Sequence, residues 1–174
     1  LISCLDEDIE AVSIEYGGRG KRRKEDYFLE YDPFFEDVAF SITEIRNNDL
    51  PYALFGYSLG SALVYDLVRK KVLDRPPNCI ILCARDFVAN KSKSQEFAFL
   101  AEDELLNVIR QLGGVDEKIF QNKRFLNIYL EPLKADYKVW AKYKYFPLLQ
   151  KFNSDVLVFY CEKDTPKELV EGWK

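Results

Sequence analysis

The 174-residue sequence contains no histidine and no methionine. Because histidine is absent, the chain itself offers no imidazole that could act as a general base near neutral pH. A chain of this length ordinarily carries a few residues of each type, and this one opens at Leu1 in sequence that already has a structured pattern. We therefore expect the 174 residues to be part of a longer product whose terminal segments are not included.

Other absences exclude whole classes of protein. No stretch approaches the roughly 18 uninterrupted apolar residues of a membrane-spanning helix, so a membrane protein is not expected. Lysine plus arginine number 25 against 29 aspartate plus glutamate, a net charge of −4, whereas nucleic-acid-binding domains are usually basic. No repeat, low-complexity segment or Gly/Ser linker divides the chain. The length then predicts one domain over residues 1–174.

The cysteines form neither a CxxC pair nor a set with zinc-ligand spacing; they are Cys4, Cys79, Cys83 and Cys161. Cys79 and Cys83 lie in an apolar run and, as strand residues, share one face. We expect small buried apolar side chains at these positions. No secretory signal precedes them, so we expect a reducing, cytoplasmic location.

Apolar periodicity predicts strands and helices in alternation. Strands are expected over Ile9–Tyr16, Pro51–Phe55, Cys79–Ala84 and Asp155–Cys161. Helices are expected over Phe34–Ile45, Leu59–Val72 and Glu102–Leu112. The continuous apolar run at Cys79–Ala84 is typical of a parallel strand buried on both faces. This alternation favours an α/β fold with a mostly parallel sheet and helices on both faces. Residues 97–150 are too long for an ordinary connection between strands and predict a helical lid.

The stretch Gly56-Tyr57-Ser58-Leu59-Gly60 matches G-x-S-x-G. In this pattern a serine on a sharp strand-to-helix turn is lifted above the sheet, and glycines let the neighbouring backbone pass closely. The following backbone N–H, that of Leu59, then points toward a developing oxyanion. A predicted strand runs into the motif and a predicted helix leaves it, so Ser58 is predicted as a nucleophile. A structural Gly-Ser turn is the alternative.

Such a serine needs an acid later in the chain. Asp164 follows the last predicted strand at its carboxyl end, where catalytic groups gather in open α/β sheets. Its alternative interpretation is a loop aspartate that starts the Thr165-Pro166 turn. Asp86, after the preceding strand, is the second candidate, and Glu162 is a distant third.

Several segments together resemble the type II thioesterases of nonribosomal peptide and polyketide assembly lines, a branch of the α/β-hydrolase superfamily. They follow in the family's order over nearly the whole chain. They are residues 14–20 (IEYGGRG), 51–63 (PYALFGYSLGSAL), 112–115 (LGGV) and 130–137 (LEPLKADY), followed by Asp164 and Trp173. Gly17, Tyr57 and Leu59 replace the family's usual proline, histidine and methionine, but these changes lie beside the site.

The resemblance implies a serine thioesterase that releases stalled or mis-primed acyl groups from the phosphopantetheine arm of acyl or peptidyl carrier proteins. It implies Ser58 as nucleophile, Asp164 as acid, and Leu59 N–H as one oxyanion donor. The family's catalytic histidine and second oxyanion donor lie on terminal segments that these residues do not include. No metal or cofactor is implied, no nucleic acid or membrane partner is expected, and we expect a monomer.

The resemblance also assigns possible roles to the lid and to basic residues. An acyl channel is predicted to involve Tyr57, Phe97, Phe99, Leu105, Ile109 and Phe120. The alternative is plain core, which is the more common role of such an apolar stripe in the lid. An acidic carrier would be drawn to positive surface. The run Lys21–Lys24 is either a solvated loop or such a docking site, and the lid lysines Lys134, Lys138, Lys142 and Lys144 are the other candidates.

Two alternatives stay open. One is another α/β-hydrolase, either an esterase or a medium-chain acyl thioesterase. The other is a non-catalytic hydrolase-like protein that binds a carrier.

Overall fold

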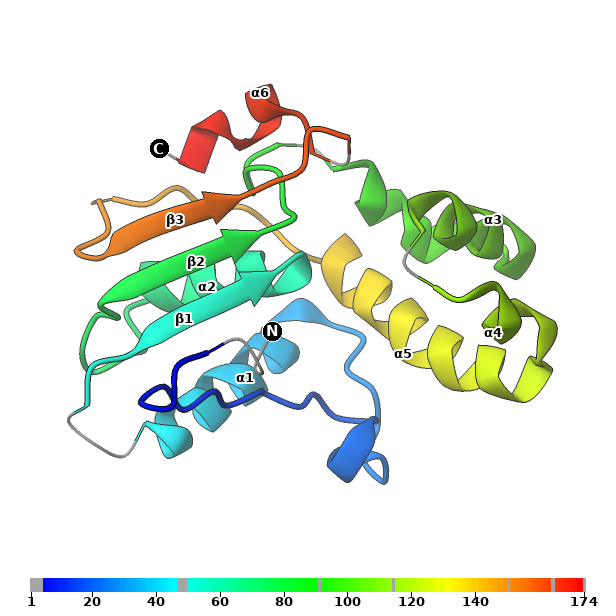
Figure 1. The fold of residues 1–174 in the computed structure, drawn as a ribbon, viewed down its shortest axis with the longest axis horizontal. Coiled ribbons are helices and arrows are strands. Elements are labelled where there is room, and N and C mark those ends of the chain that lie inside the picture. Colours follow the sequence, from blue (N-terminus) through cyan, green and yellow to red (C-terminus); the bar gives the residue numbers. More distant parts are fainter. Residues whose placement is uncertain are drawn as a thin grey trace.

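A three-stranded parallel sheet forms the centre of the chain in the computed structural model, which describes residues 5–46, 50–90, 92–113, 115–149, 151–163 and 165–173. The strands lie in the order β1 (Ala53–Tyr57), β2 (Cys79–Cys83) and β3 (Asp155–Phe159), as Figure 1 shows. The register pairs the first residues of all three strands and likewise the last, so their carboxyl ends are level. The predicted α/β class with a parallel sheet is confirmed.

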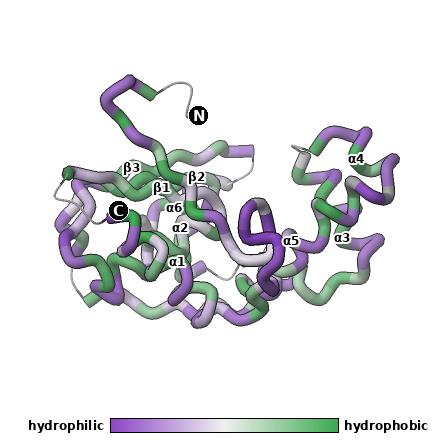
Figure 2. Tube along the Cα trace, turned by 90° about the horizontal axis from the view of Figure 1, so that it is seen from below, coloured by the Kyte–Doolittle hydropathy of each residue, from purple (hydrophilic) through white to green (hydrophobic). Residues whose placement is uncertain are grey.

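Helices α1 (Tyr31–Ile45) and α2 (Leu59–Arg69) pack on one side of this sheet (Figure 2). The apolar spacing of α1 buries its core-facing stripe, and α2 is buried without interruption from Ser61 to Leu67. On the same face, alternate strand residues are buried, among them Leu54, Ile80 and Leu82. One main core therefore lies between α1, α2 and the sheet.

The other sheet face is covered only in part by the described residues. Cys79, Ile81 and Cys83 are half-buried, which corrects the prediction of a strand buried on both faces. On this face the side chains of the two outer strands are more exposed: Phe55 of β1 is 48% exposed and Phe159 of β3 is 58% exposed. The two cysteines share a face as expected, but they are half-buried and not buried as predicted. Cys161, past the end of β3, is exposed, and Cys4 lies outside the described residues.

The predicted strand Ile9–Tyr16 is wrong for the structure: the segment has no regular secondary structure and pairs with no described strand. Its residues 9–13 are exposed, while Ile14 and Tyr16 pack on the main core. The end of the segment is bonded to the turn that follows it, because the side chain of Glu15 accepts a hydrogen bond from the Lys21 N–H at 2.7 Å. Side-chain alternation alone does not supply the partner strand that a ladder requires.

The other predicted elements are present with shifted ends. Helix α1 begins three residues earlier than expected, β1 lies two residues later, and α2 and β3 end earlier. Helix α3 (Glu102–Leu112) has the predicted bounds. Short elements complete the fold: η2 (Gly20–Arg22), α6 (Lys167–Val170) and η4 (Glu171–Trp173).

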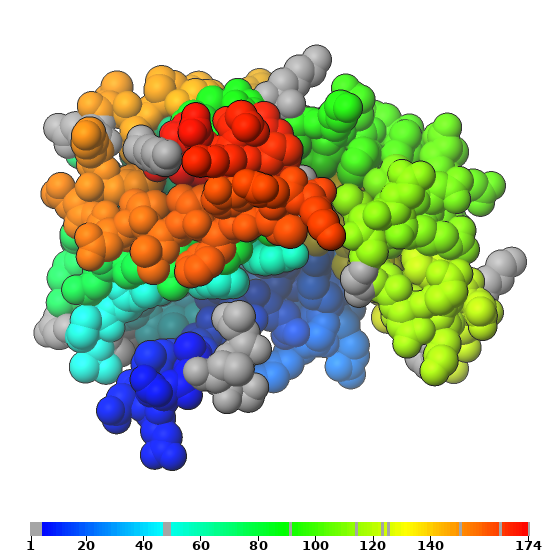
Figure 3. Space-filling view, turned by 45° about the horizontal axis from the view of Figure 1, so that its top comes forward, coloured from blue at the N-terminus to red at the C-terminus, as the bar shows by residue number. Residues whose placement is uncertain are grey.

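The residues predicted as a lid form a helical group beyond the carboxyl ends of the strands (Figure 1). It consists of η3 (Lys93–Phe99), α3, α4 (Glu117–Gln121) and α5 (Lys123–Ala141). The group has its own small core, separate from the main core, built on Leu105, Ile109, Leu126 and Leu130. In the space-filling view its green and yellow atoms form a distinct lobe (Figure 3). We call residues 97–150 the lid segment.

Candidate active site

Ser58 occupies the junction between β1 and α2, as the sequence motif requires. Its backbone has φ 52° and ψ −112°, a left-handed conformation that side-chain-bearing residues rarely adopt. The strain is held in place because the Ser58 N–H donates to the Cys83 carbonyl at 2.9 Å on the neighbouring strand. Strained backbone of this kind is concentrated at functional sites. The geometry is that of a nucleophile elbow.

Gly56 makes this turn possible. A Cβ built on Gly56 would lie 2.6 Å from the Gly60 carbonyl oxygen and 2.7 Å from the Ser61 Cα, both backbone atoms. The Ser61 hydroxyl also donates to the Gly56 carbonyl at 2.9 Å, which fastens the start of α2 onto β1. A Cβ built on Gly60 meets no atom of the described residues within 4 Å. The first glycine of the motif is thus required by packing, and the second is not.

The amino end of α2 follows Ser58 directly. Leu59 is the first residue of α2, so its N–H has no acceptor within the helix. The helix dipole adds partial positive charge at this end. The local geometry is suited to an oxyanion donor beside the Ser58 hydroxyl, and the oxyanion role of Leu59 stays a prediction.

The candidate acids have different surroundings. Asp164 lies outside the described residues, and Glu162 is exposed after β3. Asp86 lies past the carboxyl end of β2, with its Oδ1 3.2 Å from Nε of Arg85, and burial raises the pKa of its carboxyl. The Arg85 guanidinium is buried against the ring of Trp140, 3.7 Å from its centroid. The carboxylate of Asp86 is therefore paired with Arg85, which itself packs against Trp140 of α5.

The predicted substrate residues have different surroundings in the structure. Leu105 and Ile109 are 2% and 3% exposed within the lid segment's own core, which favours the core interpretation for both. Phe97 is half-buried against Tyr137, and Phe120 lies beneath Arg110. Phe99 is 80% exposed. Tyr57, on the open sheet face beside Ser58, is 66% exposed. Their roles in substrate contact stay predictions.

The basic run is divided between internal and solvent-facing residues. Arg22 binds Asp37 through two hydrogen bonds of 2.7 Å and also binds Glu25, and these bonds raise the pKa of Arg22. Lys21, Arg23 and Lys24 are exposed. Among the lid lysines, Lys134 is paired with Glu102 and Glu131 and Lys142 with Glu30, while Lys138 and Lys144 are exposed.

Sequence analysis missed two arginines that join the lid segment to the rest of the fold. Arg19 forms a two-pronged ion pair with Asp136, and Arg85 stacks on Trp140. Arg19 and Asp136 both lie in segments that carry the family resemblance, but a separation of 117 residues gives no local signal of pairing.

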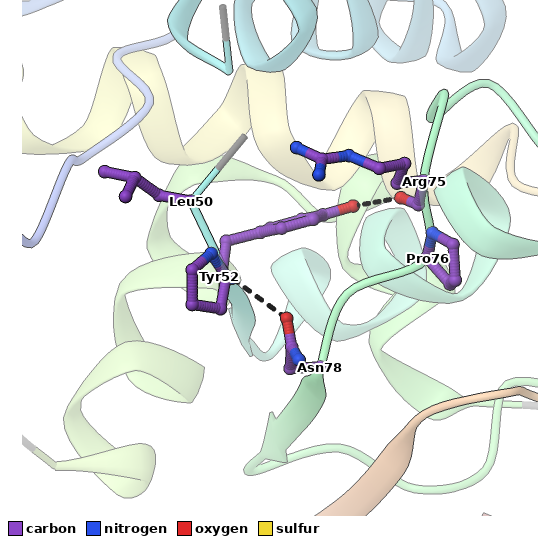
Figure 4. A pocket seen from close by; sticks show the side chains of 6 residues that line it. Leu50, Tyr52, Arg75, Pro76 and Asn78 are labelled. Atoms are coloured by element: carbon purple, nitrogen blue, oxygen red, sulfur yellow. Dashed lines mark hydrogen bonds between the residues drawn. The ribbon is translucent and has the colours of Figure 1, made fainter. Parts of the chain in front are cut away.

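Two surface hollows, of about 310 and 450 Å³, lie at the amino ends of the strands, at the opposite edge of the sheet from Ser58. In the first, Tyr52 and Asn78 tie the entries of β1 and β2 together: Asn78 Oδ1 accepts from the Tyr52 N–H at 3.2 Å (Figure 4). The Tyr52 hydroxyl donates to the Arg75 carbonyl. These contacts cross-link the strand entries and give the hollow a structural explanation.

The family model of the thioesterase domain matches residues 1–174. The chain belongs to the thioesterase domain family. Among curated relatives, this thioesterase-domain chain is 29% identical over 181 residues to thioesterase PikA5 of Streptomyces venezuelae, covering 98% of the chain and 61% of that protein. It is 28% identical over 158 residues to the medium-chain S-acyl fatty acid synthase thioesterase of Anas platyrhynchos, covering 82% and 61%.

Among solved structures, the thioesterase-domain chain superposes on the RedJ thioesterase of the prodiginine pathway in Streptomyces coelicolor with a TM-score of 0.78 and 26% identity. The match covers 92% of the chain and 63% of RedJ. The α/β-hydrolase fold is confirmed by this superposition. The chain spans about three fifths of the length of these relatives. No helix in the described part of the chain is long and apolar enough to cross a membrane.

Proposed function

We propose that the protein is a serine thioesterase that hydrolyses acyl groups from the phosphopantetheine arm of carrier proteins in nonribosomal peptide or polyketide synthesis. The observation that carries the proposal is the left-handed backbone of Ser58 at the strand-to-helix turn. Membership of the thioesterase domain family and the likeness to PikA5 and RedJ support it. By this proposal the task is release of stalled or mis-primed intermediates.

In this scheme the Ser58 hydroxyl attacks the thioester carbonyl, and its proton passes to a histidine outside these 174 residues, since the chain has none. Asp164 orients that imidazole and stabilises its charged form. The Leu59 N–H and a second donor outside the chain hold the oxyanion. The thiol of the arm leaves with the proton, and water then releases the acid from the acyl-enzyme. The lid segment covers the acyl group.

Turnover of three substrates tests the proposal in the protein that contains this chain. We expect acyl-carrier thioesters to be hydrolysed with the highest kcat/KM, acyl-CoA more slowly, and oxyesters least, because the carrier adds binding energy that small esters lack. A preference for medium-chain acyl-CoA would favour the fatty-acyl alternative, which the likeness to the Anas platyrhynchos enzyme keeps open. Preference for oxyesters would indicate an esterase. Binding of a carrier without turnover would indicate a non-catalytic protein.

Exposed positive side chains are the proposed docking site for the acidic carrier. Changing Lys21, Arg23 and Lys24 together to glutamate is expected to raise KM for acyl-carrier substrates about tenfold and to leave small thioesters unchanged. Arg22 is kept, because its pairing with Asp37 holds the turn together. A second variant changes the exposed Lys138 and Lys144 to glutamate and tests the other candidate docking site, on the lid side, by the same comparison. An equal effect of the triple variant on both substrate classes would end the docking hypothesis.

A further inference from the structure

The turn around Gly17–Glu25 connects the main core with the lid segment through charged side chains. On the main-core side, Arg22 holds Asp37 of α1 with two bonds of 2.7 Å. Within the turn, the Gly18 N–H donates to the Arg22 carbonyl at 3.1 Å. Gly18 has φ 83° and packs on Tyr27, where an added Cβ would lie 2.4 Å from the ring. The turn is therefore fixed to α1 before it reaches the lid.

On the lid side, Arg19 holds Asp136 of α5. Its Nη1 and Nη2 donate to the two carboxylate oxygens at 2.9 Å each, a planar fork that adds geometric specificity. Both side chains are about three-quarters buried, at 26% and 27% exposure. The guanidinium also lies 5.3 Å and 5.9 Å from the ring centroids of Tyr16 and Tyr27. Burial, followed by the charge of Asp136, raises the pKa of Tyr16 to about 12, so this ring is neutral.

Asp136 sits where α5 passes from one core to the other. Before it, Leu126, Leu130 and Leu133 pack in the lid core. After it, Val139 and Trp140 pack in the main core. Pro132 lies between, and because it has no N–H, the helix lacks one backbone hydrogen bond one turn before Asp136. The ion pair thus holds α5 one turn after Pro132, where the helix lacks a backbone hydrogen bond.

We propose that Arg19 and Asp136 form a latch that fixes the orientation of the lid core over the carboxyl edge of the sheet. This inference rests on the proposed function for its consequence: release of the latch widens the entrance through which an acyl group reaches Ser58. Arg19 is a positioning residue, since it acts through α5 and not on the reacting atoms.

Hydrogen exchange of lid amides tests the latch without any activity measurement. In Asp136→Asn, amides of α3 and of the first half of α5 are expected to exchange about 3- to 10-fold faster, the range that follows for a partly buried, two-pronged pair. Amides of β2 in the main core should keep their rate. The double variant Arg19→Asp with Asp136→Arg, which reverses the pair, is expected to restore the lid rates.

The matched control is Glu30→Gln, which removes the Glu30–Lys142 pair. That pair also joins the end of α5 to the main core, at 3.2 Å, but its side chains are 62% and 54% exposed. Its removal should leave lid exchange unchanged. Lid rates in Asp136→Asn equal to those of the unmodified chain or of the control would overturn the latch. So would acceleration of β2 amides by the same factor, or a folded reversed pair that restores nothing.

A second measurement addresses the entrance. In the protein that contains this chain, Asp136→Asn is expected to raise kcat/KM for dodecanoyl thioesters several-fold relative to acetyl thioesters. An unchanged ratio would overturn the entrance role of the latch. If the unmodified protein hydrolyses neither thioester, the proposed function fails, while the exchange result still decides the latch itself.

Discussion

Replacing Ser58 with alanine is expected to lower kcat for thioester hydrolysis by about 10⁴- to 10⁶-fold, the scale on which loss of the nucleophile acts in serine hydrolases. The size follows because the residues of a triad act as one unit, and removal of the attacking oxygen disables all of it. The fold should be preserved, since the turn is held by the backbone bond from Ser58 to Cys83 and not by the hydroxyl. The measurement is single-turnover hydrolysis of an acyl-carrier thioester by the protein that contains this chain.

Covalent labelling supplies an independent check. A serine-directed fluorophosphonate is expected to add one group to the unmodified protein, at Ser58, and none to Ser58→Ala, as read by intact mass. Ser13→Ala is the matched control, because Ser13 is exposed in the irregular segment before the Gly17 turn and its replacement should leave labelling and turnover unchanged. Full activity in Ser58→Ala would show that the elbow serine is not the nucleophile.

Gly56→Ala is expected to lower the free energy of unfolding by about 3 kcal/mol or more, at the upper end for overpacking a core position. The added methyl group would meet backbone atoms of Gly60 and Ser61 at 2.6 to 2.7 Å. Backbone cannot rotate aside as a flexible side chain does, so β1 and α2 must separate. Because Ser58 lies between them, the elbow geometry is lost together with stability.

Gly60→Ala is the paired control for this prediction. Its Cβ meets no atom within 4 Å in the part of the chain that the structure describes, and alanine is favoured over glycine in a helix by about 1 kcal/mol. Urea unfolding should therefore place Gly60→Ala at or above the unmodified chain and Gly56→Ala well below it. Equal midpoints for the two variants would contradict the close approach of β1 and α2.

Local pattern was sufficient where an element is defined by its own residues. The apolar spacing of α1 and of α3 predicted both helices, because helical hydrogen bonds close within the segment. The G-x-S-x-G motif predicted the turn at Ser58 for a similar reason: its geometry depends on the strand before it and the helix after it.

Local pattern failed where the partner is distant. Ile9–Tyr16 alternates like a strand, yet no described strand pairs with it, and its end follows the hydrogen bonds of the Gly17 turn instead. The burial of Leu105 and Ile109 in a separate lid core was likewise undecided by their helical stripe, which a channel and a core share. Burial depends on which surface meets the stripe, and sequence periodicity does not contain that information.

The sequence by itself determined the fold class, the turn at Ser58 and the family resemblance, because each depends on short local patterns and on their order along the chain. Tertiary structure alone decided that Gly56 and not Gly60 is required by packing. It also decided that Arg22 is an internal ion-pair partner, unlike its basic neighbours, and that Arg19 grips Asp136. Contacts between residues far apart in the chain form only when the whole core assembles. Each such contact depends on where two distant elements lie, and the residues next to either partner in the sequence do not specify that position.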